Sequence, residues 1–427
     1  MATAARKYDL YSPEFYADAY ATFAQMREHD PVFCQPGLDG ETPIWWVTRY
    51  EDAEAVLLDD ERFVRDPQLA LPPERFAEFQ ANLPESIAFV DSHMLNRDGD
   101  DHRRLRRLVS KAFTPRMIEQ LRPRIQQIAD ALLDPVAAAG EMELVSAFAF
   151  PLPITVIAEL LGVPPADRDR FREWSNAFVS PALEADELQR FVLSMQEFST
   201  YLHALFVQRR QEPGDDLISA LVAVEDGGDT LSEQELSSMV ALLIVAGHET
   251  TVSLIGNATL ALFEHPEQRA VLERDPALLP RAVEELIRYD GPVERTLNRW
   301  AAVDVELRGR TIRRGQSVIV VLGAADRDPE RFAAPDTLDL SAERDARHLG
   351  FGRGSHFCLG APLARLEAEI ALGTLLRRLP GLRLAISPEE LRWRPVPLFR
   401  SLAALPVAWS QAVGASALAA GQAGTEP

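Results

Sequence analysis

The sequence predicts a mainly α-helical protein with small β-sheets. Most segments show helical hydrophobic periodicity, and two β-rich stretches interrupt them. One is IWWVT at residues 44–48. The other is residues 303–322, where alternating or β-branched runs flank turns at Arg308-Gly309 and Arg314-Gly315. Because no Gly/Ser- or Pro-rich linker divides the chain, we expect a single domain over residues 1–412. The Ala/Gly-rich residues 413–427 lack periodicity and are predicted to be a disordered tail.

The best-defined helix extends from about Glu233 to Glu264. Ser232 and Glu235 form an S-x-x-E capping box at its start. His265-Pro266 ends it, because the residue before a proline avoids helical geometry. At a rise of 1.5 Å per residue, such a helix is roughly 48 Å long. Its middle, MVALLIVAG, is apolar on every side, so we expect it to be buried and to cross the whole core.

Shorter helices are expected at residues 101–113 and 281–289, the second ending before Gly291-Pro292. Another helix begins near Cys358 and continues through LARLEAEIALGTLL.

Composition excludes several classes of protein. The net charge of −21 argues against nonspecific binding to nucleic acid, since a polyanion would be repelled. Two cysteines, Cys34 and Cys358, are too few for a secreted disulfide scaffold and fit a reducing cytoplasm. The N-terminus has no signal-peptide core, and the apolar residues 144–158 fall short of the ~20 that a spanning helix needs. We therefore expect a cytoplasmic protein with no membrane anchor and no nucleic-acid partner.

The stretch FGRGSHFCLGAPLAR, residues 351–365, surrounds Cys358 with three glycines and leads into a helix. Glycine lets the backbone approach a ligand closely. The N-terminal amides of the helix are expected to favour the thiolate and to lower the cysteine pKa. Such a thiolate suits a nucleophile or a metal ligand, whereas the alternative is a structural cysteine buried in a turn. No cluster of Cys and His surrounds Cys358 in the sequence, which argues against zinc.

The pattern F-G-x-G-x-H-x-C-x-G-x-x-L-A-R in this stretch resembles the haem-binding loop of the cytochromes P450, of the soluble bacterial type. The resemblance extends from about Tyr8 to Trp409. It implies that haem b lies between the long central helix and the helix after the cysteine loop. Cys358 is then the axial ligand of the iron, and Phe351 and Gly360 belong to the cofactor site. Arg353 departs from the family, which usually has an aromatic residue or histidine there.

The middle of the long helix reads Ala246-Gly247-His248-Glu249-Thr250-Thr251. Ala246 and Thr250 are four residues apart and share a face, with Glu249 near it. In isolation the segment would be an ordinary buried helix whose threonines bond to the preceding turn. It resembles the A-G-x-E-T-T signature of P450s, which implies that Thr250 and Glu249 are the alcohol–acid pair of oxygen activation. Ala246 and Gly247 then lie against the haem, and His248 is packed or solvent-facing.

Four further residues resemble the partners of the haem propionates in the family: His102 and Arg106, four apart on one helix, with Arg299 and His356. Buried carboxylates need such cationic partners. The alternative is that they are surface charges.

Glu285 and Arg288 match the E-x-x-R pair of P450s. The family adds an arginine three places after Asp339, where this chain has Ala342. Arg344 is the nearest substitute.

The resemblance implies a monooxygenase that hydroxylates or epoxidises a hydrophobic small molecule with O2. Because no redox domain is fused, we expect a separate ferredoxin or flavodoxin-type donor with its reductase, and a monomeric enzyme. Arg103, Arg107 and Lys111 form a basic stripe that is either the docking face of an acidic donor or a solvated surface. The alternatives that keep the haem are a peroxygenase, a nitric-oxide-reducing enzyme, and a non-enzymatic haem carrier or sensor.

Overall fold

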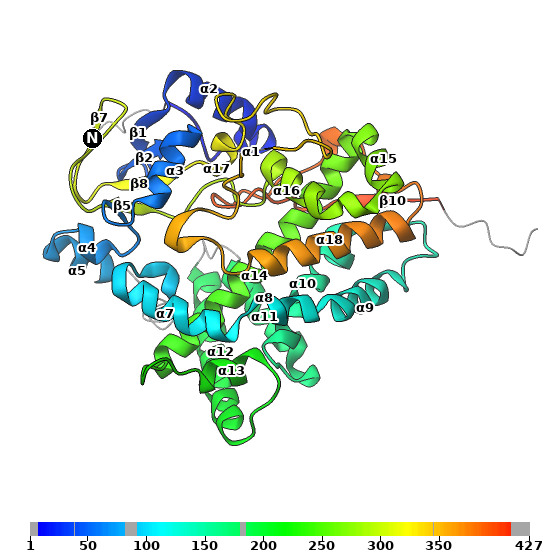
Figure 1. Ribbon diagram of the computed structural model, residues 1–427, viewed down its shortest axis with the longest axis horizontal. Helices are drawn as coiled ribbons and strands as arrows, with labels where there is room; N and C mark the ends of the chain where they lie inside the picture. Colours follow the sequence, from blue (N-terminus) through cyan, green and yellow to red (C-terminus); the bar gives the residue numbers. More distant parts are fainter. Residues whose placement is uncertain (1–6, 38, 82–91, 180–184, 345, 411–427) are drawn as a thin grey trace, which may run out of the picture.

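The computed structural model describes residues 7–37, 39–81, 92–179, 185–344 and 346–410 (Figure 1). The predicted tail at 413–427 lies outside these residues, and the single-domain boundary stays a prediction. A small sheet with short N-terminal helices occupies one corner of the molecule. Helices form the rest, around a long central helix (Figure 1).

The main sheet has five strands in the order β1-β2-β8-β5-β3. The strand β2 pairs in parallel with β8, and Trp45 lies opposite Val318, whereas the other pairings are antiparallel. This joins the two β-rich stretches of the sequence, about 270 residues apart, as neighbours in one sheet. The strands are β1 (Val32–Pro36), β2 (Pro43–Val47), β3 (Phe63–Val64), β5 (Arg299–Ala301) and β8 (Ser317–Val320).

Two smaller sheets complete the β-structure of the described residues. A hairpin joins β6 (Val305–Leu307) and β7 (Arg310–Ile312) through the predicted turn at Arg308-Gly309, where both residues have positive φ. The other sheet has the order β4-β10-β9, with β4 (Glu141–Glu143), β9 (Arg383–Leu384) and β10 (Pro406–Ala408).

The helices carry most of the described chain. Those before the central helix are α1 (Pro13–Ala17), α2 (Ala19–His29), α3 (Tyr50–Leu58), α4 (Pro67–Ala70), α5 (Pro73–Ala81), α7 (Gly99–Ala112), α8 (Pro115–Gln120), α9 (Arg122–Leu133), α10 (Pro151–Leu160), α11 (Arg168–Val179), α12 (Ala185–Gln211) and α13 (Leu217–Ala223). Those after it are α15 (Pro266–Arg274), α16 (Leu279–Asp290), α17 (Leu322–Ala325) and α18 (Ala361–Arg378).

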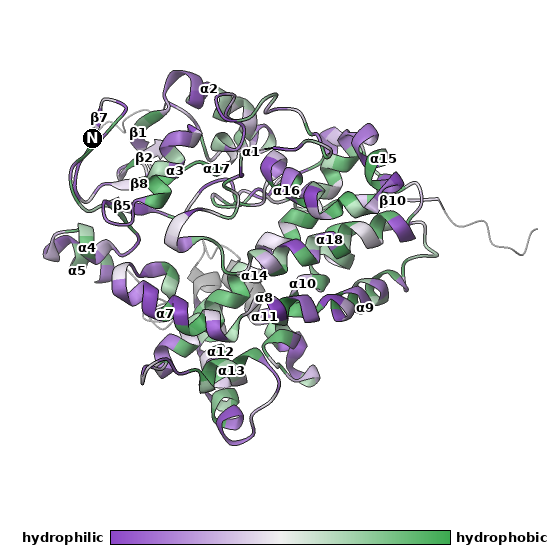
Figure 2. Cartoon of the chain, viewed as in Figure 1, coloured by the Kyte–Doolittle hydropathy of each residue, from purple (hydrophilic) through white to green (hydrophobic). Residues whose placement is uncertain are grey.

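The central helix is α14 (Glu233–Glu264), and the sequence prediction of it is confirmed at both ends. The capping box of Ser232 and Glu235 is present, and the helix stops at His265. It packs against α10, α16 and α18, and green predominates along it in the hydropathy view (Figure 2). By length and composition α14 could cross a membrane, but 72% of its most apolar window is buried inside the protein. We therefore interpret it as the core helix of the fold.

The predicted pair of Glu285 and Arg288 is confirmed by its geometry, and the structure shows Arg344 as its third partner. Arg288 Nε and Nη2 donate to the two carboxylate oxygens of Glu285, both at 2.8 Å. Arg344 Nε and Nη2 donate to the same two oxygens at 2.7 Å, so Arg344 replaces the arginine that is absent at Ala342. Arg288 also donates to three backbone carbonyls. These bonds fix the end of α16 to the irregular chain that leads to the cysteine.

Replacement of Glu285 by alanine should cost about 3–5 kcal/mol of unfolding free energy, because two guanidinium groups would lose their shared partner and Arg288 is only 2% exposed. Denaturant unfolding followed by circular dichroism measures the loss. Glu343→Ala is the matched control, since this carboxylate is 92% exposed and should change stability by less than about 0.5 kcal/mol. Equal losses in the two variants would contradict the structural role of the triad.

Candidate active site

A cavity of about 370 Å³ lies between the middle of α14 and the cysteine loop. Its walls come from α7, α14, α18, β5 and the loop at residues 350–360, segments that are far apart in the sequence. It contains ten of the eleven site residues predicted from the sequence: His102, Arg106, Ala246, Gly247, Thr250, Arg299, Phe351, His356, Cys358 and Gly360. The eleventh, Glu249, is not among the described residues that line the cavity.

The cysteine loop is shaped by glycines in the left-handed conformation. Gly352 has a φ of 70° and Gly354 a φ of 73°. A Cβ on Gly354 would lie 2.7 Å from the carbonyl oxygen of Leu57, so only glycine fits against α3 there. The Cys358 amide donates to the Phe351 carbonyl at 3.0 Å, which closes the loop. The helix α18 begins at Ala361, directly after Gly360, as the sequence predicts.

The expected lowering of the Cys358 pKa is wrong for the protein alone. Burial raises the pKa of this thiol, and it outweighs the amides of Gly360 and Ala361 and the charge of Arg106, which all lower it. The prediction weighed the helix amides but not the removal of water from the sulfur. Cys358 is half-buried, and a metal ion coordinated at its sulfur would favour the thiolate, because it deprotonates a coordinating thiol outright.

Cationic side chains gather at one edge of the cavity. Arg299 is buried and lies 3.5 Å from Asp60, and His356 Nε2 lies 3.5 Å from Asp98. The rings of His102 and His356 are 4.2 Å apart. Burial, together with the charges of His356 and Arg106, lowers the pKa of His102 to about 4. Since burial and neighbouring positive charge both oppose protonation here, this edge favours an anion.

Sequence reasoning missed Arg65 in this group. Arg65 is buried, lines the cavity, and donates through Nε to the Leu95 carbonyl at 3.2 Å and through Nη1 to the Asn298 carbonyl. Burial and the charge of Arg299 lower its pKa to about 10. It follows β3 as a lone arginine in FVRDP, where no spacing or motif marks it.

On α14, the two threonines make different contacts. Thr250 lines the cavity, and its hydroxyl donates to the Ala246 carbonyl at 2.7 Å, the back-bonded geometry. Thr251 donates to the Gly247 carbonyl at 3.2 Å and also contacts Glu367 of α18. Glu367 is buried, and burial raises its pKa to about 8, so it is mainly protonated at neutral pH. This acid was not predicted, although it follows the cysteine by nine residues.

Glu249 was expected near the face of Thr250, and this expectation is wrong. Consecutive helix residues are turned by about 100°, which carries the Glu249 side chain off the cavity face. There its carboxylate pairs with Arg394 from the C-terminal segment. Burial raises the pKa of Glu249, against the lowering effect of Arg394. His248 is packed rather than solvent-facing, because its ring is buried edge-on against Phe150 with 4.4 Å between centroids.

Most of the remaining wall of the cavity is apolar, with Arg295 and Thr296 as exceptions. Above the threonine, its described residues include Leu242, Leu243, Val245, Val293, Leu297, Leu398 and Phe399. By resemblance to the family, substrate contacts are also expected at residues 69–94 and 178–191, and these segments lie partly outside the described residues.

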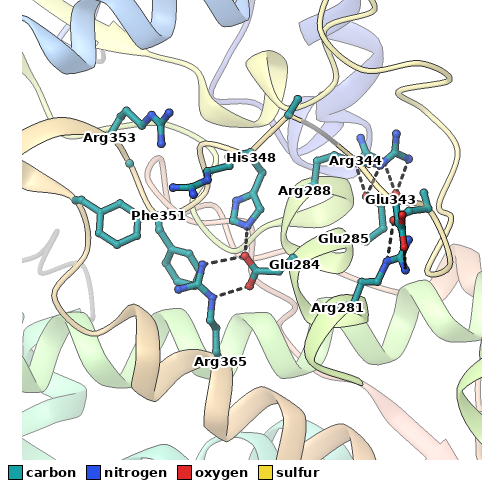
Figure 3. Close-up of a pocket in the computed structure, with 15 residues that line it drawn as sticks. Arg281, Glu284, Glu285, Arg288, Glu343, Arg344, His348, Phe351, Arg353 and Arg365 are labelled. Atoms are coloured by element: carbon teal, nitrogen blue, oxygen red, sulfur yellow. Dashed lines mark hydrogen bonds and ion pairs between the residues drawn. The ribbon is translucent and has the colours of Figure 1, made fainter. Parts of the chain in front are cut away.

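A second hollow, of about 660 Å³, lies beside the cysteine loop (Figure 3). Phe351, Gly352 and Arg353 line both this hollow and the cavity. Arg365 of α18 donates to both oxygens of Glu284, at 2.6 and 2.8 Å, and lies over the Phe351 ring. Figure 3 shows further arginines around the hollow, among them Arg281, Arg344 and Arg353. Among the described residues, the hollow is therefore lined by six arginines and three glutamates, close to the sulfur-bearing loop.

The cavity residues fit haem b. One cysteine sulfur faces the space under α14, the wall is otherwise apolar, and the cationic edge matches two carboxylates. Cys358 would hold the iron, while Arg65, His102, Arg106, Arg299 and His356 would hold the propionates. The fold and this site define a haem-thiolate enzyme.

Comparison with known proteins agrees with this class. A family profile described as Cytochrome P450 matches residues 183–380. Cytochrome P450 107B1 of Saccharopolyspora erythraea is 48% identical over 92% of this chain and 95% of its own length. The mycinamicin IV hydroxylase/epoxidase of Micromonospora griseorubida is 46% identical, covering 91% and 94%. The crystal structure of myxobacterial CYP267B1 in complex with myristic acid superposes with a TM-score of 0.87 at 45% identity, covering 94% and 99%.

The chain belongs to the cytochrome P450 family. It is a monooxygenase with haem b as its cofactor, and its substrates are small molecules, as in its relatives.

Replacement of Arg106 by methionine should speed haem loss roughly 10- to 100-fold, the effect of losing a charge-assisted hydrogen bond of about 1.5–3 kcal/mol. Transfer of haem from the purified holoprotein to apomyoglobin measures the rate. Arg107→Met on the same helix is the control, because Arg107 is exposed and pairs with Asp226. Equal rates in the two variants would contradict the role of Arg106 at the propionate edge.

Proposed function

We propose that this monooxygenase hydroxylates or epoxidises a neutral, largely apolar small molecule. The observation that carries the proposal is the cavity wall above Thr250, which is aliphatic and aromatic among the described residues. Such a wall gains free energy from burying apolar surface and offers a charged group no partner. The name of one relative, a hydroxylase/epoxidase, is consistent with this reaction, and the long alkyl chain of the myristic acid bound to another is consistent with an apolar pocket.

In this proposal, different side chains of the protein have different roles in the reaction. When bound, the haem supplies the iron at which O2 is activated, and the thiolate of Cys358 favours O–O cleavage. The Thr250 hydroxyl lies at the cavity wall and can turn from the Ala246 carbonyl to hold a proton there. Glu249 supplies protons to that side of the helix from a site outside the cavity. Leu398 and Phe399 exclude water and orient the substrate.

The reduced, CO-treated holoprotein tests thiolate ligation, and the wild type should show the shifted Soret band of a haem-thiolate enzyme. Cys358→His, which keeps a metal ligand, should lose that band. Spectral titration with neutral apolar compounds and with matched cationic amines then tests the substrate class. Tighter binding of the cationic amines would contradict the proposed substrate class. Peroxide-driven turnover that outruns donor-driven turnover would favour a peroxygenase instead.

We infer that a redox partner supplies the electrons, as the bacterial P450 relatives imply, and that it is a ferredoxin or flavodoxin-type donor with its reductase. The basic hollow beside the cysteine loop supports docking there, because Phe357, next to the cysteine, is 38% exposed at its rim. The basic stripe on α7 is the other candidate. Its charges are paired, Arg107 and Lys111 with Asp226 and Arg103 with Asp100, and Arg353 of the hollow is paired in the same way with Glu54.

Charge reversal at Arg347 and Arg353, which line the hollow, should slow reduction by an acidic ferredoxin about tenfold or more at low salt, as expected when electrostatic steering is lost. Stopped-flow reduction of the CO complex measures the rate, and the difference should shrink as salt screens the charges. Arg103→Glu serves as the control. A larger effect from Arg103→Glu would place docking on α7 instead.

The same proposal includes a cytoplasmic, monomeric enzyme. Its relatives are bacterial, and a reducing compartment suits two free cysteines, of which Cys34 is exposed.

A further inference from the structure

Arg365, seven residues after Cys358, is held against the cysteine loop from α18. Its Nε and Nη2 donate to the two carboxylate oxygens of Glu284 on α16, at 2.6 and 2.8 Å (Figure 3). The centre of its guanidinium lies 4.4 Å from the centroid of the Phe351 ring. A bidentate carboxylate and an aromatic face together fix both the place and the orientation of this positive charge.

Phe351 connects the guanidinium to the loop that carries the sulfur. Its carbonyl accepts the hydrogen bond of the Cys358 amide at 3.0 Å, and the residue lines the haem cavity as well as the neighbouring hollow. Burial raises the pKa of Cys358, and the charge of Arg365 is among the effects that lower it. Arg106 acts on the same sulfur from α7. The thiolate is therefore in the field of Arg365 as well as of the residues at the propionate edge.

The neighbours of Glu284 keep it ionised. Its Oε2 accepts from His348 Nε2 at 3.3 Å. The Gly350 amide donates to His348 Nδ1 at 3.1 Å, so the other ring nitrogen, Nε2, carries the proton of a neutral imidazole. Burial raises the pKa of Glu284, but His348 and Arg365 outweigh this effect and lower the pKa to about 2. At neutral pH, Glu284 and Arg365 thus form a pair of opposite charges beside the cysteine loop.

We propose that the Arg365 guanidinium helps to set the reduction potential of the bound haem, and that Glu284 is the positioning residue that holds this guanidinium against Phe351. The step concerned is the uptake of one electron by the ferric iron from the redox partner, in which no bond of the protein forms or breaks. A nearby positive charge favours the form that carries the extra electron, and a negative charge opposes it. Arg365 therefore raises the potential, whereas the charge of Glu284 lowers it. The inference rests on the haem-thiolate site and not on the substrate or the docking face proposed above.

Removal of one charge should move the potential in the direction that its sign dictates. Both side chains are partly exposed, at 33% and 39%, so solvent screens them and the effect is moderate. Arg365→Gln should lower the equilibrium constant for one-electron reduction about three- to tenfold, which is about 30–60 mV toward lower potential. Glu284→Gln should raise the constant by a similar factor. The double variant, in which both charges are absent, should lie close to the wild type.

Spectroelectrochemical titration of the full-length, substrate-free holoprotein with small mediators measures the potential without a partner protein. The infrared C–O stretch of the reduced, CO-treated protein is a second readout, because it follows the electron density that the thiolate donates to the iron. This frequency should fall in Arg365→Gln and rise in Glu284→Gln. Arg365→Lys, which keeps the charge, should restore most of both values.

The matched control is Glu343→Gln. Glu343 lies on the rim of the same hollow, is 92% exposed, and pairs with Arg281 of α16 at 3.4 Å. Because solvent screens so exposed a charge, this variant should leave the potential and the C–O frequency unchanged. A shift as large as that of Glu284→Gln would mean that any charge on the rim has the same effect, and the inference would fail.

The signs of the shifts separate an electrostatic role from a structural one. If the pair only anchors α18 to α16, both single variants lose stability in denaturant unfolding, and their potentials move in one direction or stay unchanged. Either result contradicts the inference. If Arg365→Gln does not fold or bind haem, an unshifted potential in Glu284→Gln is equally decisive against it. A wild type without the haem-thiolate CO spectrum would instead contradict the enzyme class, which the variants do not test.

Discussion

The rest of this structure depends on the burial of one sulfur atom. Desolvation raises the pKa of Cys358, and two backbone amides and Arg106 offset only part of that cost. A metal ion at the sulfur would stabilise the thiolate in this position, because it would share the negative charge. The loop meets this constraint by geometry: left-handed glycines bring the backbone against α3, and the sulfur faces α14 across the cavity. The triad of Glu285, Arg288 and Arg344 then fixes the chain that leads into the loop.

The same argument applies at the edge of the cavity. Arg65, His102 and Arg299 are buried, and their pKa values are all lowered mainly by desolvation. Each guanidinium or imidazole in this position favours an anionic partner more strongly than it would in water. The site thus combines two electrostatic demands, for a cation at the sulfur and for anions at the opposite edge. A single iron porphyrin with two carboxylates satisfies both.

Much of the fold and of the candidate site could be predicted from the sequence, because the patterns that indicate them are local. A capping box and an apolar run define α14, and a long motif identifies the cysteine loop. The spacing of Glu285 and Arg288 identifies their pair, whereas Ala342 leaves the third partner open and only the structure shows that it is Arg344. Arg65 and Arg394 could not be predicted in this way, since each reaches its place through contacts between distant segments. The direction of the Cys358 pKa shift failed for a related reason: burial depends on tertiary packing, whereas the helix amides can be read from the local sequence.

The position of Glu249 shows how a motif can be right in its residues and incomplete in its geometry. A short signature names the acid and the alcohol as a pair, but a turn of about 100° between neighbours separates their side chains across the helix. The two acids near this part of α14 then differ in charge. Glu249 faces a guanidinium that favours its ionised form, whereas Glu367 meets a threonine hydroxyl and is mainly neutral at pH 7. Because environments that differ in this way assign different proton-transfer roles to similar groups, Glu249 is suited to accept a proton from solvent. The acid and the alcohol of the signature therefore meet different partners, because Glu249 is paired with Arg394 whereas Thr250 lines the cavity.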